Sequence, residues 1–98
     1  MKVVIVDPDK QPYVKEIRNE LKPMKSIVKG YLETIPLIIE NKQFIGVCNE
    51  EGSFTEKPNR VFNGMILYGP FFIAGFDGLS EFEGLSDEDL ALVLSYFN

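Results

Sequence analysis

The stretch that decides the predicted fold is Lys2-Val3-Val4-Ile5-Val6, in which four consecutive apolar residues follow a lysine. Side chains alternate between the two faces of an extended chain, so both faces of this stretch are apolar. A β-branched run of this kind predicts a central strand. The prolines and aspartates of residues 7–12 end it in a turn. Tyr13 to Ile17 then predicts a second short strand, and the two strands together predict a hairpin.

A first helix is predicted from Glu20 to Lys29, because apolar residues recur on one face of that segment. Asn19 is the expected N-cap, and Gly30 is a natural C-terminal stop. Pro23 fits only the first turn of a helix, where its missing N–H has no helical partner. The helix is therefore expected to begin nearer Lys22.

Three further strands and a hairpin follow. Residues 31–39 predict a strand at an edge or with a bulge, because Pro36 cannot donate to a neighbour. Residues 43–49 predict another strand, and residues 53–60 are typical of a loop. Asn63-Gly64 predicts a tight hairpin turn, and Phe71 to Phe76 predicts a buried strand.

The clearest helix is the last one. Ser86 is the expected N-cap, and Asp89 three residues later completes a capping-box pattern. A full core face follows at helical spacing, formed by Leu90, Val93, Leu94 and Phe97.

This order of elements, β-β-α-β-β-hairpin-β-α, predicts an α+β fold because helices and strands do not alternate regularly. We expect a mostly antiparallel sheet of five to six strands with two helices packed on one face. Residues 1–98 contain no visible linker or repeat, so a single domain is expected.

Composition excludes several chemistries. The 98 residues include no His, no Trp and one Cys, which removes Ser-His-Asp and Cys-His catalysis and makes a zinc site implausible. We therefore expect no metal and no cofactor. Carboxylates such as Glu33, Glu50, Glu51 and Asp77 could still perform acid–base chemistry, but nothing in their spacing pairs two of them.

The net charge of −5 is unevenly distributed. Residues 1–30 hold seven Lys or Arg against four Asp or Glu, whereas residues 61–98 hold six acids and no base. The early bases are interleaved with acids and form no stripe, so direct nucleic-acid binding is disfavoured. No apolar run is long enough to span a membrane.

Cys48 is expected to be a small buried hydrophobe in an alternating strand, which fits a reducing, cytoplasmic setting. No signal peptide is expected, because the first strand begins at Lys2.

One polar constellation is a candidate binding site. Amide and guanidinium groups on adjoining loops recognise carboxylates, phosphates or base edges, and a tyrosine and a glutamate of the neighbouring strand could line the same cleft. The candidate ligand-binding residues are Tyr31, Glu33, Asn49, Glu50, Asn59 and Arg60. The alternative is turn chemistry plus a surface ion pair of Arg60 with Glu50 or Glu51.

Leu92 and Tyr96 form a second apolar row on the last helix. This row is interpreted mainly as additional core, with a homodimer interface as the alternative.

Several strings in this order resemble a small family of bacteriophages and mobile elements known as a domain of unknown function (thirty-eight forty-six). The strings are Lys2–Val6, Ile27–Glu33, Val47–Gly52, Pro58-Asn59-Arg60, Gly69–Gly75 and Leu85–Glu88. The resemblance covers nearly the whole chain, but Lys29 stands where the family often has a second glycine. It implies a phage or mobile-element origin and action in the bacterial cytosol, and it implies no known reaction.

The leading functional hypothesis is a non-catalytic binding protein that sequesters a small anionic, nucleotide-like ligand or a host protein, as a counter-defence factor. A homodimeric protein-interaction module is the second hypothesis, and a small carboxylate-dependent hydrolase is the third.

Overall fold

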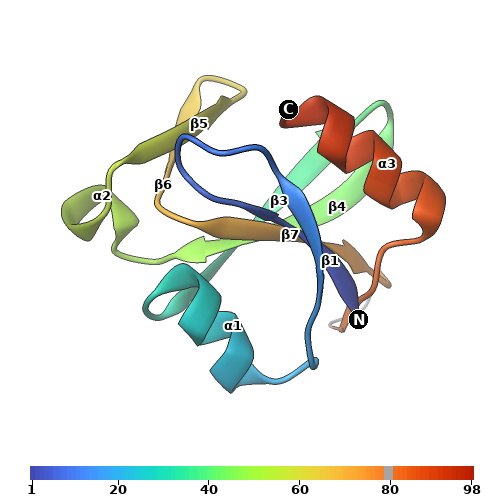
Figure 1. The fold of residues 1–98 in the computed structure, drawn as a ribbon, viewed down its shortest axis with the longest axis horizontal. Coiled ribbons are helices and arrows are strands. Elements are labelled where there is room, and N and C mark those ends of the chain that lie inside the picture. The colour runs from blue at the N-terminus through green and yellow to red at the C-terminus, as the bar shows by residue number, and fades with distance from the viewer. Residues whose placement is uncertain (79–80) are drawn as a thin grey trace.

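The computed structural model describes residues 1–78 and 81–98 and has an α+β fold (Figure 1). The helices are α1 (Leu21–Val28), α2 (Gly52–Thr55) and α3 (Asp87–Tyr96). The strands are β1 (Lys2–Val6), β2 (Tyr13–Glu16), β3 (Leu32–Ile39), β4 (Lys42–Asn49), β5 (Pro58–Phe62), β6 (Met65–Tyr68), β7 (Phe71–Phe76) and β8 (Phe82–Glu83). The predicted fold class is confirmed.

The main sheet has six strands in the order β2-β1-β7-β4-β3, and β8 pairs with the end of β7. Every pairing among the described strands is antiparallel; Val4 lies opposite Ile73, and Ile45 lies opposite Ala74. β1 is an inner strand, as its apolar sequence predicts. β3 is an edge strand, which leaves Pro36 where its missing N–H does least harm.

The helices lie on opposite faces of the sheet, so the prediction that they share one face is wrong. Val3 and Ile5 pack in one apolar cluster with Met24 and Val28 of α1. Val4 and Val6 pack in the other cluster, to which α3 and the β5–β6 ribbon contribute. The cause lies in β1, whose successive apolar side chains point to opposite faces of the sheet. Both faces must therefore be buried, and each is covered by a different helix. Figure 1 shows α1 and α3 at opposite corners, with β1 and β7 between them.

The two ends of α1 differ from expectation. Glu20, not Asn19, occupies the N-cap position, because the Asn19 side chain donates instead to the Phe82 carbonyl at 3.0 Å. At the other end Lys29, not Gly30, takes the left-handed conformation that closes the helix, with φ of 64°.

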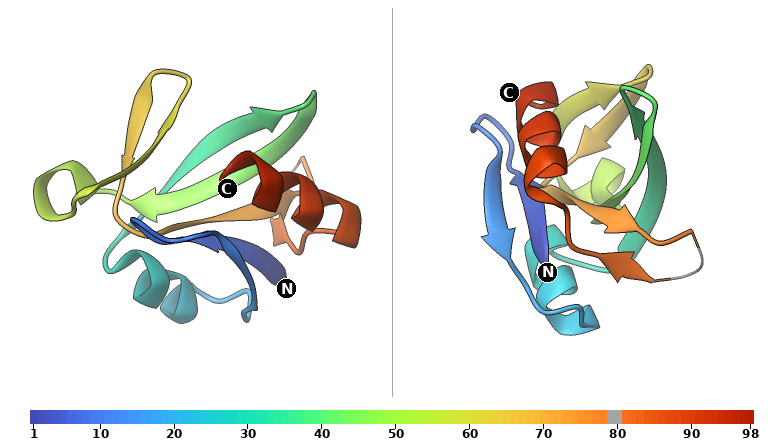
Figure 2. Two further views of the ribbon diagram at one scale, coloured as in Figure 1. Left: turned by 45° about the horizontal axis from the view of Figure 1, so that its top comes forward. Right: turned by 90° about the vertical axis from the view of Figure 1, so that its right-hand side faces the viewer.

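The β5–β6 ribbon is a separate two-stranded sheet, and Phe62 and Leu67 pack into the core cluster on the α3 face of the main sheet (Figure 2). Its turn has positive φ at Asn63 (49°) and Gly64 (77°), as the Asn-Gly pair predicts. The segment expected to be a loop, 53–60, contains most of α2 and the start of β5. α2 and β8 were not predicted, because they are too short to show a periodic pattern.

In the described part of the chain, no helix has both the length and the apolarity needed to cross a membrane.

Candidate functional site

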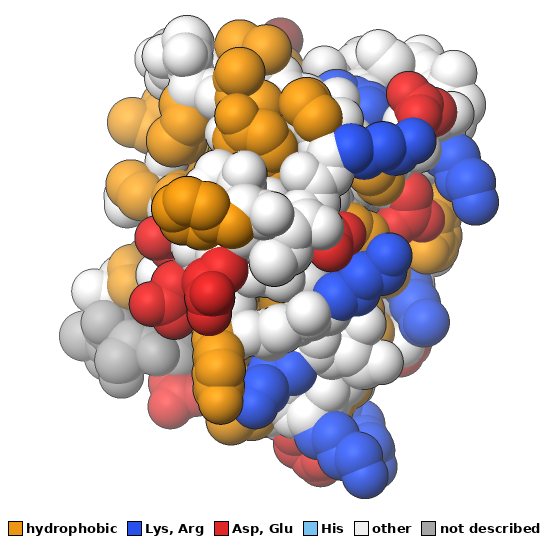
Figure 3. Space-filling view, turned by 90° about the vertical axis from the view of Figure 1, so that its left-hand side faces the viewer, with side chains coloured by type: hydrophobic (Ala, Val, Ile, Leu, Met, Phe, Trp, Pro, Cys, Tyr) orange, Lys and Arg blue, Asp and Glu red, His pale blue; other side chains and the backbone are white. Residues whose placement is uncertain are grey.

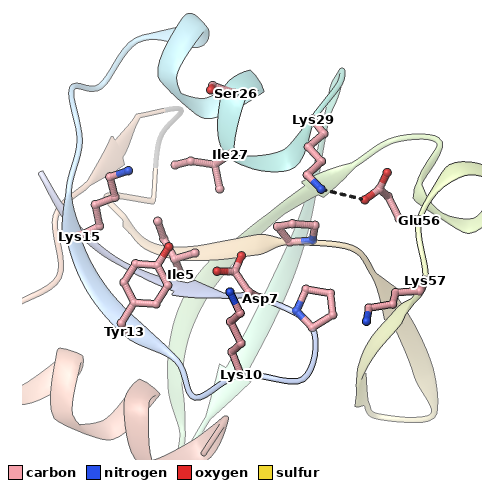
Figure 4. Close-up of a pocket in the computed structure, with 12 residues that line it drawn as sticks. Ile5, Asp7, Lys10, Tyr13, Lys15, Ser26, Ile27, Lys29, Glu56 and Lys57 are labelled. Atoms are coloured by element: carbon pink, nitrogen blue, oxygen red, sulfur yellow. Dashed lines mark ion pairs between the residues drawn. The ribbon is translucent and has the colours of Figure 1, made fainter.

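A pocket of about 580 Å³ lies between α1, the hairpin of β1 and β2, and the segment that joins α2 to β5 (Figure 4). Its volume is within the range of small-molecule sites. We call it the lysine pocket, because Lys10, Lys15, Lys29 and Lys57 line it.

The lysines come from four separate elements and converge only in the folded chain. Lys10 lies in the β1–β2 loop, Lys15 in β2, Lys29 at the end of α1 and Lys57 just before β5. The acidic lining residues are Asp7 and Glu56, so cations outnumber anions two to one. Figure 3 shows Lys and Arg side chains gathered along one side of the face it presents.

Two of the four ammonium groups are paired and two are not. Lys57 pairs with Asp9, and Lys29 lies 3.8 Å from Glu56. The Lys57 ammonium holds the pKa of the Asp9 carboxyl below its usual value, through its hydrogen bond first and its charge second. Within residues 1–78 and 81–98, the ammonium groups of Lys10 and Lys15 have no ion-pair partner. These two charges are free to meet an anion from solution.

Apolar side chains form one part of the lining of the lysine pocket, beside the Asp7 carboxylate. Ile5 and Pro70 are buried, Ile27 is half-buried, and the Tyr13 ring is 43% exposed beside them. Partial burial first, and then the charge of Asp7 and its hydrogen bond, raise the pKa of the Tyr13 phenol. The phenol is therefore protonated at neutral pH. The pocket thus has an apolar, partly aromatic wall together with charged groups, most of them cations.

Asn49, a predicted ligand-binding residue, is buried and fully engaged within the fold. Its amide nitrogen donates to the carbonyls of Val28 (3.1 Å) and Lys29 (3.2 Å), and its oxygen accepts from the Glu51 N–H at 2.8 Å. The side chain thus caps the C-terminal carbonyls of α1, which otherwise lack helical donors.

Asn59 and Arg60 lie together on β5. The Asn59 amide donates to the carbonyls of Val6 and Gly69, both at 2.8 Å. The Arg60 guanidinium donates to the Asn59 side-chain oxygen and to the Lys10 carbonyl, both at 2.7 Å. Neither residue lines the lysine pocket.

The remaining predicted residues lie elsewhere. Glu33 and Glu50 line a small groove of about 130 Å³, together with Asn49. Tyr31 is 64% exposed, with the Lys25 ammonium 4.6 Å from its ring centroid. The structure therefore brings Glu33, Asn49 and Glu50 together and places Asn59 and Arg60 in a second group.

The apolar row of α3 is partly core. Leu92 is half-buried against the core, whereas Tyr96 is 47% exposed and makes edge contacts with the rings of Phe62 and Phe97. The homodimer alternative stays a prediction.

Cys48 is buried, as predicted. Burial, and secondarily the charge and hydrogen bond of Glu33, raises the pKa of the thiol to about 11. In the described residues no group of three or more His, Cys, Asp or Glu side chains is placed to hold a metal ion.

The lysine pocket was not predicted from the sequence. The available signal was the excess of basic residues in the first 30 positions. Their alternation with acids argued against a stripe along the chain, but a pocket gathers charges from different elements and needs no linear pattern.

The fold and this geometry define a small α+β protein with a six-stranded antiparallel sheet between α1 and α3 and a cationic pocket at one side. The family described as "Domain of unknown function (DUF3846)" matches residues 1–98, and the chain belongs to this family. No curated protein and no solved structure matches the chain.

Proposed function

We propose that this protein binds a small, nucleotide-like anion in the lysine pocket and does not transform it. The observation that carries the proposal is the pair of unpartnered ammonium groups, Lys10 and Lys15, on a concave surface of about 580 Å³. Unpaired cations at a concave surface attract anions and orient them on approach.

The lining favours a ligand that has both a charged and a flat apolar part. Lysine is a common phosphate-binding residue, and an aromatic face accepts a nucleobase by stacking. Tyr13 offers such a face between Lys10 and Lys15. Inorganic phosphate alone would leave the apolar wall formed by Ile5, Tyr13 and Pro70 unused.

The proposal extends to the biological setting implied by the family resemblance. Stoichiometric binding of a nucleotide signal in a bacterial cytosol would remove that signal from a host defence pathway, which is the counter-defence role expected above.

Isothermal titration with ADP and with a cyclic dinucleotide tests the proposal, with adenosine and pyrophosphate as partial ligands. We expect Lys10→Gln and Lys15→Gln each to weaken binding of the better nucleotide by about fivefold or more. Lys22→Gln, an exposed lysine of α1 outside the pocket, is the matched control. Absence of binding by the native protein, or equal losses in all three variants, would contradict the proposal.

The same samples distinguish binding from catalysis. Intact nucleotide after prolonged incubation supports a non-catalytic role. Turnover would instead favour the hydrolase alternative, for which Glu33 and Glu50 at the small groove are the carboxylates to replace.

A second candidate function is a homodimeric interaction module. Apolar side chains are exposed on the β5–β6 ribbon and α2: Val61 by 68%, Ile66 by 44% and Phe54 by 87%. Exposed apolar surface of this kind often marks protein interfaces. Light scattering over a range of concentrations tests this candidate, and a monomer at every concentration would contradict it.

A further inference from the structure

Asn59 bonds the chain on two sides of the lysine pocket without lining it. Its amide nitrogen donates to the carbonyl of Val6, which directly precedes the lining residue Asp7. The same nitrogen donates to the carbonyl of Gly69, which directly precedes the lining residue Pro70. One amide therefore links two walls of the pocket to β5.

Arg60 holds a third wall. One terminal nitrogen of its guanidinium donates to the Lys10 carbonyl at 2.7 Å, and the other donates to the Asn59 side-chain oxygen at 2.7 Å. Nε is 3.4 Å from the carbonyl of Phe97, at the end of α3. A planar guanidinium donates in fixed directions, so these contacts define the place of the Lys10 backbone relative to the rest of the fold.

The loop that carries Lys10 depends on such support. Residues 7–12 lie outside the strands, and two of them, Pro8 and Pro12, have no N–H to donate. The ion pair of Asp9 with Lys57 also reaches this loop, but both of its side chains are exposed, and exposed pairs stabilise weakly. The Arg60 guanidinium is held at the same time by the Asn59 side chain, so its exposed bond to the Lys10 carbonyl has a fixed direction that the Lys57 ammonium lacks.

We infer that Arg60, oriented by Asn59, is a positioning residue of the lysine pocket: it holds the loop that presents the Lys10 ammonium and so sets the affinity for phosphate-bearing ligands. This inference rests on the proposed function. In this role Asn59 and Arg60 of the Pro58-Asn59-Arg60 motif support the pocket without touching the ligand, whereas the sequence predicted that they bind the ligand directly.

A double-mutant cycle measured with ADP separates positioning from general stabilisation. The variants are Lys10→Gln, Arg60→Gln and the double variant, with Arg18→Gln as the control for loss of an arginine. Arg18 is exposed and pairs only loosely with Glu20, at 3.7 Å. We expect Lys10→Gln and Arg60→Gln each to weaken binding about fivefold. The double variant should also lose about fivefold, because without Arg60 the Lys10 ammonium is displaced and its removal costs little more affinity.

Independent action gives a different result. If Arg60 contacts the ligand itself, the two losses multiply to about 25-fold. If Arg60 stabilises only the fold, Arg60→Gln binds ADP as tightly as the native protein. Either result overturns the inference. Arg60→Lys restores a donor without the planar geometry, so it should recover only part of the affinity. Full recovery would also contradict the inference.

A ligand-free measurement keeps the inference distinct from the proposed function. Amide NMR spectra of Arg60→Lys should show altered signals and raised mobility for residues 9–13, and unchanged signals in β3 and β4. If the native protein binds no nucleotide, the proposed function is wrong. The NMR comparison still tests whether Arg60 holds the loop in place, because it needs no ligand. Native-like spectra for residues 9–13 would overturn the positioning role.

Discussion

Lys29 is a strained residue at the rim of the candidate site. It ends α1 with φ of 64°, and its N–H donates to the Lys25 carbonyl at 2.8 Å. A left-handed conformation costs a residue with a Cβ about 1 kcal/mol relative to glycine. Lys29 therefore adds a fourth ammonium group to the pocket at some cost in stability.

We therefore predict opposite effects of Lys29→Gly on stability and binding. The substitution should raise the free energy of unfolding by about 0.5–1 kcal/mol and weaken nucleotide binding severalfold. Lys29→Gln is the matched control, because it removes the charge and keeps the strain. Urea denaturation and titration of the two variants test this, and a less stable Lys29→Gly protein would contradict it.

Asn49 is predicted to stabilise the fold. Asn49→Ala leaves two α1 carbonyls and the Glu51 N–H without their partner, at a cost of about 2–3 kcal/mol in urea denaturation. Asn19→Ala, which removes one exposed bond, should cost less than about 1 kcal/mol. Equal costs for the two variants would contradict this assignment.

The Cys48 thiol is predicted to be unreactive in the native protein. A pKa raised to about 11 by burial and by Glu33 leaves few thiolates at pH 8. A small thiol reagent should react about a hundredfold more slowly than with the urea-unfolded chain. Because the folded pKa lies above the reference value of 9.0, the thiol contributes stability below pH 9 and loses it as the pH rises through 11. Rapid native labelling at pH 8 would refute this.

At the scale of elements, α3 begins where its cap predicts. The Asp89 N–H donates to the Ser86 hydroxyl at 3.1 Å, while the Asp89 carboxylate accepts from Lys42 at 2.9 Å instead of returning to the cap. Ser86→Ala should lower the free energy of unfolding by about 1 kcal/mol, which is measured as a lower midpoint of thermal unfolding. Ser53→Ala, an exposed serine of α2, is the control, and equal effects would argue against the cap.

Elements with strong local signals were predictable, and elements defined by distant partners were not. Asn63-Gly64 and Ser86 each act within a few residues, and the structure confirms both. Asn19 has a typical capping side chain, but it bonds to Phe82 at a distance of 63 positions in the sequence. Nothing near Asn19 in the sequence could have shown that competition.

The candidate site is harder to predict than the fold for the same reason. Asn59 and Arg60 were singled out by residue type together with Asn49, but Asn49 lies in a different groove. The partners of the two β5 residues are the main-chain carbonyls of Val6, Gly69 and Lys10, to which no sequence pattern points. The lysine pocket likewise depends on how the β1–β2 hairpin packs beside α1, which no local sequence pattern shows.

At the scale of the whole molecule, we predict that the chain unfolds as one cooperative unit. The two apolar clusters lie on opposite faces, but neighbouring residues of β1, Val3 and Val4, belong to different clusters. Neither face can lose its packing without disturbing the strand on which the other depends. Met24→Ala in α1 and Val93→Ala in α3 should therefore each lower the stability of the entire chain by about 2–3 kcal/mol.

Circular dichroism and tyrosine fluorescence, recorded in parallel during urea denaturation, test this cooperativity. Both signals should give the same midpoint in the native protein, and each variant should shift both midpoints together. Tyr13 lies on the α1 side of the molecule and Tyr96 lies on α3, so the fluorescence signal reports on both faces. A variant that separates the two transitions would mean that one helix can detach while the sheet persists, and the single-domain prediction would then be wrong.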